Sequence, residues 1–412
     1  MNVKVELDKC GIDVSQLGNY QKKVDEAIDE LWSDDNPYTQ WVKLPMRVNR
    51  DELEEMFMTA IAAQDSCGLF VIVGNGGAYL GIKAAIEAIE DKVATAPEVE
   101  FVGEGISHKD FSRILERMRH YEVNVCVISN SGETAETIAA YQVIKEYMFN
   151  RYGDAVAPKR IMIMTGEGEN TLKAMADKDG CGVFRISKNY IGNYGILSPA
   201  SLFPMAVAGV EVDRLLAGAE VMATDSSWDI DAGNYAVARK LLNDQGKIVE
   251  IFQYSQSNLE SLAVWISHLF IESDGKQDKG LYTTTMNIAR DYKAKGQFMA
   301  GSRKGFIETE IAAKEVEADM KLPQDLAQLI PSDTEAQLNK TIVDAIKEVS
   351  DDEDRDCIKI EVPKMDAFNL GQIIYFFLMS AAISAHMFGV DPFERSFIDK
   401  IKDKLKLNFG KI

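Results

Sequence analysis

Cysteine is scarce in this sequence, and no long apolar run occurs. The five cysteines are scattered through 412 residues without paired spacing, at Cys10, Cys67, Cys126, Cys181 and Cys357. This pattern excludes a disulfide framework and a cysteine-based zinc site, and it is typical of reduced thiols. Residues 1–9 lack the apolar stretch of a secretion signal, and no run of eighteen apolar residues predicts a membrane span. We therefore expect a cytoplasmic protein.

Positive charge is scarce as well. The chain has 45 lysines and arginines against 65 aspartates and glutamates, which gives a net charge of −20. No basic patch stands out, so nucleic acids and anionic membranes are not expected as partners. An anionic substrate would have to be captured locally, by loop amides and helix N-termini, against the field of the whole protein.

Short apolar runs alternate with amphipathic segments along the chain. This alternation predicts an α/β fold with parallel sheets covered by helices on both faces. We expect a helical arm over 1–50, two sheet domains over 51–210 and 211–388, and a C-terminal helix over 389–412. The expected strands are 69–73, 123–128, 160–164, 182–186, 247–254, 284–291, 304–309 and 358–362, and a long apolar helix is expected over 369–387.

A loop rich in hydroxyl groups, residues 129–137, follows the predicted strand 123–128 and opens a helix. It contains Ser129, Ser131, Gly132 and Thr134. The unpaired amides and the dipole of a helix N-terminus favour a dianionic phosphate, and the hydroxyls add donors. A hydroxyl-rich helix cap is the alternative, but such a cap needs only one hydroxyl. The strand before the loop favours the phosphate site.

A second loop, residues 74–77, joins a predicted strand to a predicted helix and contains Gly76 and Gly77. Glycine turns of this kind often serve only close packing of a helix on a strand. Tyr79 occupies the position of the third glycine in a dinucleotide-binding fingerprint, so a nicotinamide site is disfavoured.

Six segments in order resemble the glucose-6-phosphate isomerase family of the short bacterial type. They read VIVGNGGAYLG at 71–81, SNSGETAET at 129–137, YGILSPASLFPMAVAG at 194–209, ESDGKQDKG at 272–280, GQF with FIET within 296–309, and GVDPFE at 389–394. The resemblance implies two sugar-isomerase (SIS-type) domains, a homodimer, and a site at the domain and subunit junction. It also implies a phosphorylated sugar as substrate, isomerised between aldose and ketose through an enediol without metal or other cofactor.

The resemblance assigns roles to particular residues. Ser129, Ser131 and Thr134 match phosphate ligands of the family, and the glycines Gly76 and Gly77 match its second loop. Glu136 matches an acidic residue of the phosphate loop. Gln297 matches a glutamine beside the active site, and Lys402 falls where the family has its ring-opening lysine. A solvated lysine is the alternative for Lys402, because Lys400, Lys404 and Lys406 flank it.

Other family positions have changed. The glutamate that acts as the base corresponds to Gly301, and the ring-opening histidine corresponds to Ser350 in an ungapped alignment. The arginine that stabilises the oxyanion corresponds to Asn193. Glycine cannot accept a proton, and asparagine cannot supply a fixed positive charge. If the family mechanism held unchanged, these losses would leave little activity.

Three functions therefore remain open on the sequence. The first is a divergent glucose-6-phosphate isomerase. The second is a homologue that binds a sugar phosphate without converting it. The third is an isomerase for a different phosphosugar that uses Glu133, whose alternative role is to cap a helix.

Overall fold

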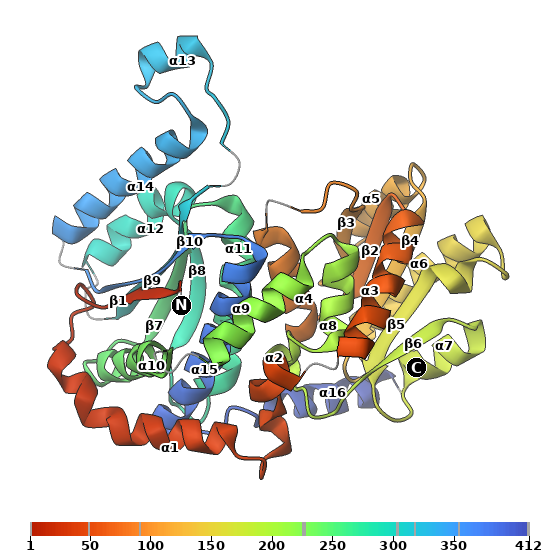
Figure 1. Cartoon of the computed structure of the whole chain (residues 1–412), viewed down its shortest axis with the longest axis horizontal. Helices are drawn as coiled ribbons and strands as arrows, with labels where there is room; N and C mark the ends of the chain where they lie inside the picture. The colour runs from red at the N-terminus through yellow and green to blue at the C-terminus, as the bar shows by residue number, and fades with distance from the viewer. Residues whose placement is uncertain are drawn as a thin grey trace.

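The computed structural model describes residues 2–47, 50–89, 92–224, 228–301, 305–316, 319–352 and 355–409. Two five-stranded sheets lie side by side, with helices packed between them and on their outer faces (Figure 1). The two sheets are formed by separate parts of the chain, apart from one N-terminal strand. The α/β class with two helix-flanked parallel sheets is therefore confirmed.

The first sheet is entirely parallel, with the strand order β3-β2-β4-β5-β6. Its central strands are buried along their whole length, which is why they appear in the sequence as unbroken apolar runs. The strands are β2 (Leu69–Gly74), β3 (Glu98–Val102), β4 (Val123–Ser129), β5 (Ile161–Gly166) and β6 (Gly182–Ile186). The helices are α3 (Arg50–Asp65), α4 (Gly77–Ala88), α5 (His108–Met118), α6 (Ala135–Tyr152), α7 (Thr171–Asp179) and α8 (Pro199–Val207).

Strand β3 was missed in the sequence because Glu98 and Glu100 interrupt the run of apolar residues that would predict a buried strand. Glu100 is buried, and its carboxylate accepts a hydrogen bond of 2.7 Å from Arg113 of α5. Charged residues are common on edge strands such as β3, where they discourage pairing with a further strand.

The second sheet has the order β1-β10-β9-β7-β8, and only β1 runs antiparallel. The strands are β1 (Lys4–Glu6), β7 (Val249–Tyr254), β8 (Tyr282–Asn287), β9 (Phe306–Glu315) and β10 (Cys357–Lys364). The helices that follow α8 are α9 (Val212–Thr224), α10 (Trp228–Asp244), α11 (Glu260–Asp274), α12 (Ile288–Gly301), α13 (Gln324–Leu329), α14 (Glu335–Asp352), α15 (Ala367–Phe388) and α16 (Ser396–Phe409).

Two expectations were wrong for the second sheet: the purely helical N-terminal arm and the end of the strand predicted over 284–291. The N-terminal arm contains helices α1 (Gln21–Trp32) and α2 (Leu44–Arg47), but it also supplies β1, which pairs with β10. The strand expected over 284–291 ends at Asn287, and α12 begins at the next residue. The domain boundaries themselves stay a prediction.

Helix α15 is the apolar centre of the second half, and it packs against α9, α10 and α11. Within the described residues it is the helix long and apolar enough to cross a membrane, but 94% of its most apolar window is buried inside the protein. A buried core helix meets the same criteria of length and hydropathy, and the burial of α15 is typical of such a helix.

Arg239 of α10 lies fully buried beside α15. It donates to Glu250 of β7 at 2.7 Å, and it also pairs with Asp274 of α11 and Ser384 of α15. This network joins three helices and one strand.

The two halves meet where α4 of the first packs against α11 of the second. The Asn258 side chain donates a 2.9 Å hydrogen bond to the carbonyl of Ala88 across this contact. The C-terminal helix α16 then runs back toward the first sheet, as Figure 1 shows. Parts of both halves thus come together near the carboxyl edge of the first sheet.

Candidate active site

A cavity of about 990 Å³ opens at the carboxyl ends of β2 and β4. The two strands are neighbours, with Gly74 of β2 opposite Ile128 of β4. The loops that follow them therefore emerge side by side, which is where open α/β sheets bind ligands. The residues that line the cavity include Gly76, Gly77, Ser129, Ser131, Glu133, Thr134, Glu136, Lys188, Glu272, Arg395 and Lys402.

The hydroxyls of the loop after β4 converge on one another. Ser129 Oγ lies 3.1 Å from Thr134 Oγ1, and Ser131 Oγ lies 3.4 Å from the same atom. Thr134 is the N-cap residue of α6, but its side chain makes no capping hydrogen bond to that helix. The first amides of α6 thus keep their capacity to bind an anion, since a helix leaves its first four N–H groups without internal partners. This geometry favours the phosphate site over the simple cap.

Gly132 is essential to the shape of this loop. Its φ is +65°, and a Cβ atom there would overlap the side-chain amide of Asn170. Asn170 in turn caps α7, because its Oδ1 accepts a 2.9 Å hydrogen bond from the Lys173 amide. A side chain at this position would therefore disturb both the loop and the start of α7.

Glu133 lines the cavity, but its carboxylate binds to the start of α7. Its carboxylate accepts two hydrogen bonds of 2.8 Å from Thr171, one from the amide and one from the hydroxyl. It therefore helps to cap α7, a helix that follows the neighbouring strand β5. The helix-capping alternative for Glu133 is the one that the structure favours, although the cap is on α7 and not on α6.

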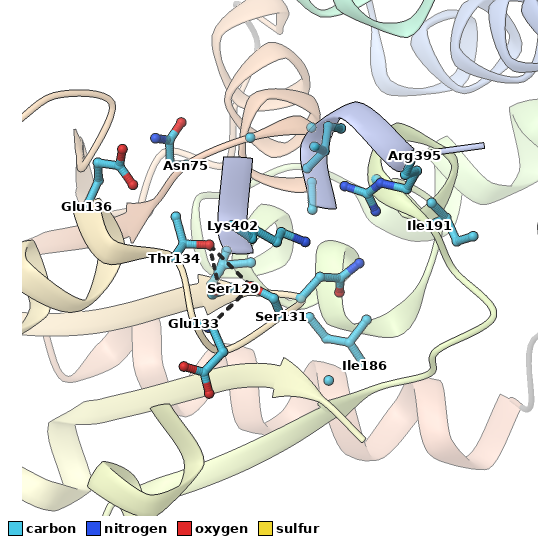
Figure 2. A pocket seen from close by; sticks show the side chains of 18 of the residues that line it. Asn75, Ser129, Ser131, Glu133, Thr134, Glu136, Ile186, Ile191, Arg395 and Lys402 are labelled. Carbon is cyan, nitrogen blue, oxygen red and sulfur yellow. Dashed lines mark hydrogen bonds between the residues drawn. The ribbon is translucent and has the colours of Figure 1, made fainter. Parts of the chain in front are cut away.

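The cavity is also lined by cations from distant parts of the chain. Lys402 and Arg395 come from α16 and the segment before it, and exposed Lys188 follows β6. In Figure 2 the Lys402 side chain extends past Ser129 and Ser131 toward the side where Arg395 lies. Three lysine and arginine side chains thus line the cavity that contains this loop, in a chain whose net charge is −20.

Glu136 lies at the other end of the cavity from Arg395 in Figure 2. It belongs to the first turn of α6 and is half-buried. Both glycines of the second loop also line the cavity; Gly76 has a φ of +88° and is the N-cap residue of α4.

Asn193 is buried beside the cavity. Its Nδ2 donates a 3.0 Å hydrogen bond to Glu272 Oε2, and its Oδ1 is buried without a partner among the described residues. A Cβ on Gly77 would lie 2.7 Å from that oxygen. The glycine is thus needed for Asn193 to pack against the backbone of the second loop.

Three residues named from the family alignment lie elsewhere. Gln297 and Gly301 belong to α12 on the second sheet, and the Gln297 side chain is exposed. The backbone of Ser350 belongs to α14. None of the three is among the described residues that line the cavity, so the structure does not bring them to the phosphate loop.

Two residues of the cavity wall were missed in the sequence. Glu272 begins the segment ESDGKQDKG, and Arg395 directly follows GVDPFE. Both segments were used for the family resemblance, so their proximity to matched motifs was the available signal. Neither residue carried a role, because only the fold places them opposite a loop more than one hundred residues away.

A smaller cavity of about 250 Å³ adjoins the first. It shares Ile191, Gly192, Glu272, Arg395 and Ile398 with the larger cavity. Lys276 lines it as well, and burial lowers the pKa of this lysine, while Asp391, Glu394 and Glu272 act in the opposite direction.

Comparison with known proteins gives consistent matches. Residues 59–290 match the family model described as phosphoglucose isomerase. A glucose-6-phosphate isomerase of Caldanaerobacter subterraneus subsp. tengcongensis is 30% identical over 91% of this chain and 87% of that protein. One from Shouchella clausii is 27% identical over 97% of this chain and 92% of that protein.

Solved structures share the fold. A hypothetical protein from Thermus thermophilus superposes with a TM-score of 0.86 at 21% identity, and it covers 98% of this chain and 99% of its own. A glucose-6-phosphate isomerase from Chlamydia trachomatis superposes with a TM-score of 0.77 at 14% identity, over 99% of this chain and 88% of its own. At these identities the likeness concerns the fold alone.

Proposed function

Because the chain belongs to the phosphoglucose isomerase family, we propose that it interconverts glucose 6-phosphate and fructose 6-phosphate. The single observation that carries this proposal is the cavity that joins the phosphate loop to Lys402 of α16. A phosphate anchor and an amine on facing walls are what a cyclic sugar phosphate needs before its ring can open.

The phosphate end of the substrate would bind to the loop after β4. Ser129, Ser131 and Thr134 would donate hydroxyl hydrogen bonds, and the N-terminus of α6 would add amides and a favourable dipole. Lys402 would then lie beside the sugar ring, where its ammonium can protonate the ring oxygen. No metal or other cofactor takes part in this scheme.

A second candidate is a protein that binds a sugar phosphate without converting it. The observation that favours it is Asn193, which lies buried beside the cavity and supplies no positive charge where the family resemblance places an arginine. The third candidate, an isomerase for another phosphosugar that uses Glu133, is weakened because that carboxylate caps α7.

A coupled assay for the conversion of fructose 6-phosphate to glucose 6-phosphate tests the proposal, with calorimetric binding of fructose 6-phosphate measured in parallel. Turnover supports the isomerase. Binding without turnover at high enzyme concentration identifies the second candidate, and turnover of pentose or amino-sugar phosphates alone identifies the third.

The variant Thr134→Val tests the phosphate loop in the same assay. Loss of a hydrogen bond to a charged group corresponds to a tenfold to hundredfold weaker affinity, by about 1.5–3 kcal/mol. Thr341→Val is the matched control, because Thr341 lies exposed on α14 and its hydroxyl bonds only within that helix. Unchanged affinity in Thr134→Val would contradict the proposed phosphate site.

We also propose that the protein is a cytoplasmic homodimer. In support, the segment around α13 projects from the body in Figure 1 and exposes apolar side chains, with Met320 62% and Leu329 82% exposed. Exposed apolar groups on a projecting segment are typical of a contact surface. Light scattering of the purified protein gives its mass directly.

A further inference from the structure

The second sheet has a polar cavity of about 260 Å³, which the proposed isomerisation does not use. Helices cover both faces of a parallel sheet, so its strands are normally apolar throughout, as β2 is. Strand β9 instead points Glu308 and Glu310 to one face, because alternate residues of a strand lie on the same side. Lys359 of β10 is the register partner of Glu310 and lines the same cavity. This face therefore carries charged residues where an apolar layer is expected.

A network of buried hydrogen bonds lines this cavity. The carboxylate of Glu308 accepts a hydrogen bond of 2.6 Å from Gln253 of β7 and one of 2.7 Å from Arg355. The hydroxyl of Tyr292, from α12, donates a third at 3.3 Å. The Glu308 and Arg355 side chains are only 7% and 8% exposed. Burial of polar groups is costly unless each of them has a partner, so any donor left over in this network is informative.

Arg355 has such a donor. Its Nη1 donates to Glu308 and to the Tyr292 hydroxyl, and its Nη2 donates to the carbonyl of Gly296 at 2.8 Å. Its Nε, in contrast, is buried without a hydrogen-bond partner among the described residues. The side chain lines the cavity, so an acceptor on a bound ligand could satisfy this N–H group. A carboxylate is well suited, because its geometry matches that of a guanidinium.

The charges around the cavity balance. Among the described lining residues, the acidic side chains are Glu6, Asp8, Glu308 and Glu310. The basic side chains are Lys9, Lys347, Arg355 and Lys359. A ligand of net negative charge would meet four carboxylates, and a ligand of net positive charge would meet four cations. A neutral ligand that carries one group of each sign avoids both repulsions. Because Glu308 already accepts from three donors, the buried carboxylate of Glu310, whose Oε1 accepts from Lys347 at 2.7 Å, is the better partner for its cationic group.

We propose that this cavity binds a small zwitterion of the α-amino acid class. The carboxylate of the ligand accepts a hydrogen bond from Arg355 Nε, and its ammonium group lies against Glu310. Buried Ile288 and half-buried Ile346 also line the cavity and contact the ligand side chain. The volume lies just below the range of about 300–1,000 Å³ that is usual for drug-sized ligands, so only a small metabolite fits. This cavity shares none of its described lining residues with the phosphate-loop cavity, so the inference does not depend on the proposed isomerase function.

A screen of the full-length protein against the twenty L-amino acids, each at about 10 mM, tests the ligand class. We expect at least one of them to raise the Tm by about 2–5 °C, because a ligand that binds only the folded state stabilises it. Calorimetry then gives the Kd of that amino acid. The amine without its carboxylate and the acid without its ammonium group are the controls, and each binds at least about tenfold more weakly. Absence of a shift with all twenty, or equal affinity for either control, overturns the proposal.

Two variants test the location of the site. Arg355→Lys keeps a positive charge beside Glu308 but lacks the Nε–H donor, so affinity for the amino acid falls about tenfold to a hundredfold. Arg290→Lys is the matched control, because it makes the same change at an exposed position of α12. Ile346→Trp fills the cavity without removing a charge and abolishes binding, and it decides the question alone if Arg355→Lys does not unfold cooperatively. Wild-type affinity in folded Ile346→Trp would place the ligand elsewhere and overturn this site.

Discussion

The two walls of the cavity are built in different ways. The phosphate wall consists of consecutive residues between β4 and α6, and in the proposed scheme it binds the phosphate through hydroxyls, amides and a helix dipole. The opposite wall consists of Glu272, Arg395 and Lys402, which lie far apart in sequence and carry full charges. The first wall can be recognised as a motif because its geometry is local. The second exists only after α11 and α16 have packed against the first half. A substitution in one wall can therefore leave the other wall unchanged.

The largest effect that distinguishes the walls is expected for Lys402→Met. If this lysine serves ring opening, kcat falls by about 10²–10⁴-fold, because an acid–base group is lost. Affinity for fructose 6-phosphate, measured by calorimetry, changes by less than tenfold. Lys400→Met is the matched control, since it removes the same charge from an exposed position of α16. If Lys402→Met lowered the affinity for fructose 6-phosphate but kept kcat, Lys402 would act in phosphate binding. That result would contradict the division of the cavity into two walls with different roles.

A smaller effect, on binding, is expected for Gly132→Ala. The added methyl would overlap Asn170 and force a side chain into a positive φ, so the loop would shift. We expect affinity for fructose 6-phosphate to fall by roughly tenfold to a hundredfold, as for a lost hydrogen bond to a charged group. Gly153→Ala is the control, because its φ is +72° and no atom lies within 4 Å of the new methyl. Equal affinity in both variants would show that the loop geometry does not govern binding.

The smallest effect on catalysis is expected for Glu133→Gln. The carboxylate caps α7 through Thr171, so its loss lowers the free energy of unfolding by about 0.5–2 kcal/mol. Chemical denaturation measures this change. Turnover stays within about threefold, since the residue takes no part in proton transfer. Turnover that fell a hundredfold would restore the hypothesis in which Glu133 is the base.

Much of the fold could be predicted from the sequence, because buried parallel strands form unbroken apolar runs. The strand over 182–186 has the expected bounds, and β2 and β4 extend one residue beyond them. Strands β1 and β3 were missed. Both lie at sheet edges, where short length and paired charges replace the apolar pattern. The end of β8 was also misplaced, because Ile288 continues the apolar pattern while the backbone turns into α12.

For the candidate site, too, the local features could be predicted from the sequence and the long-range contacts could not. The sequence by itself predicted a hydroxyl-rich loop between a strand and a helix, because the strand, the glycine and the hydroxyls that form it are neighbours in the chain. Only the tertiary structure decided that Glu133 caps α7, that Asn193 holds Glu272, and that Arg395 and Lys402 face the loop. These contacts join residues that are 38 to more than 250 positions apart, and their proximity depends on how whole helices pack, which no local pattern encodes.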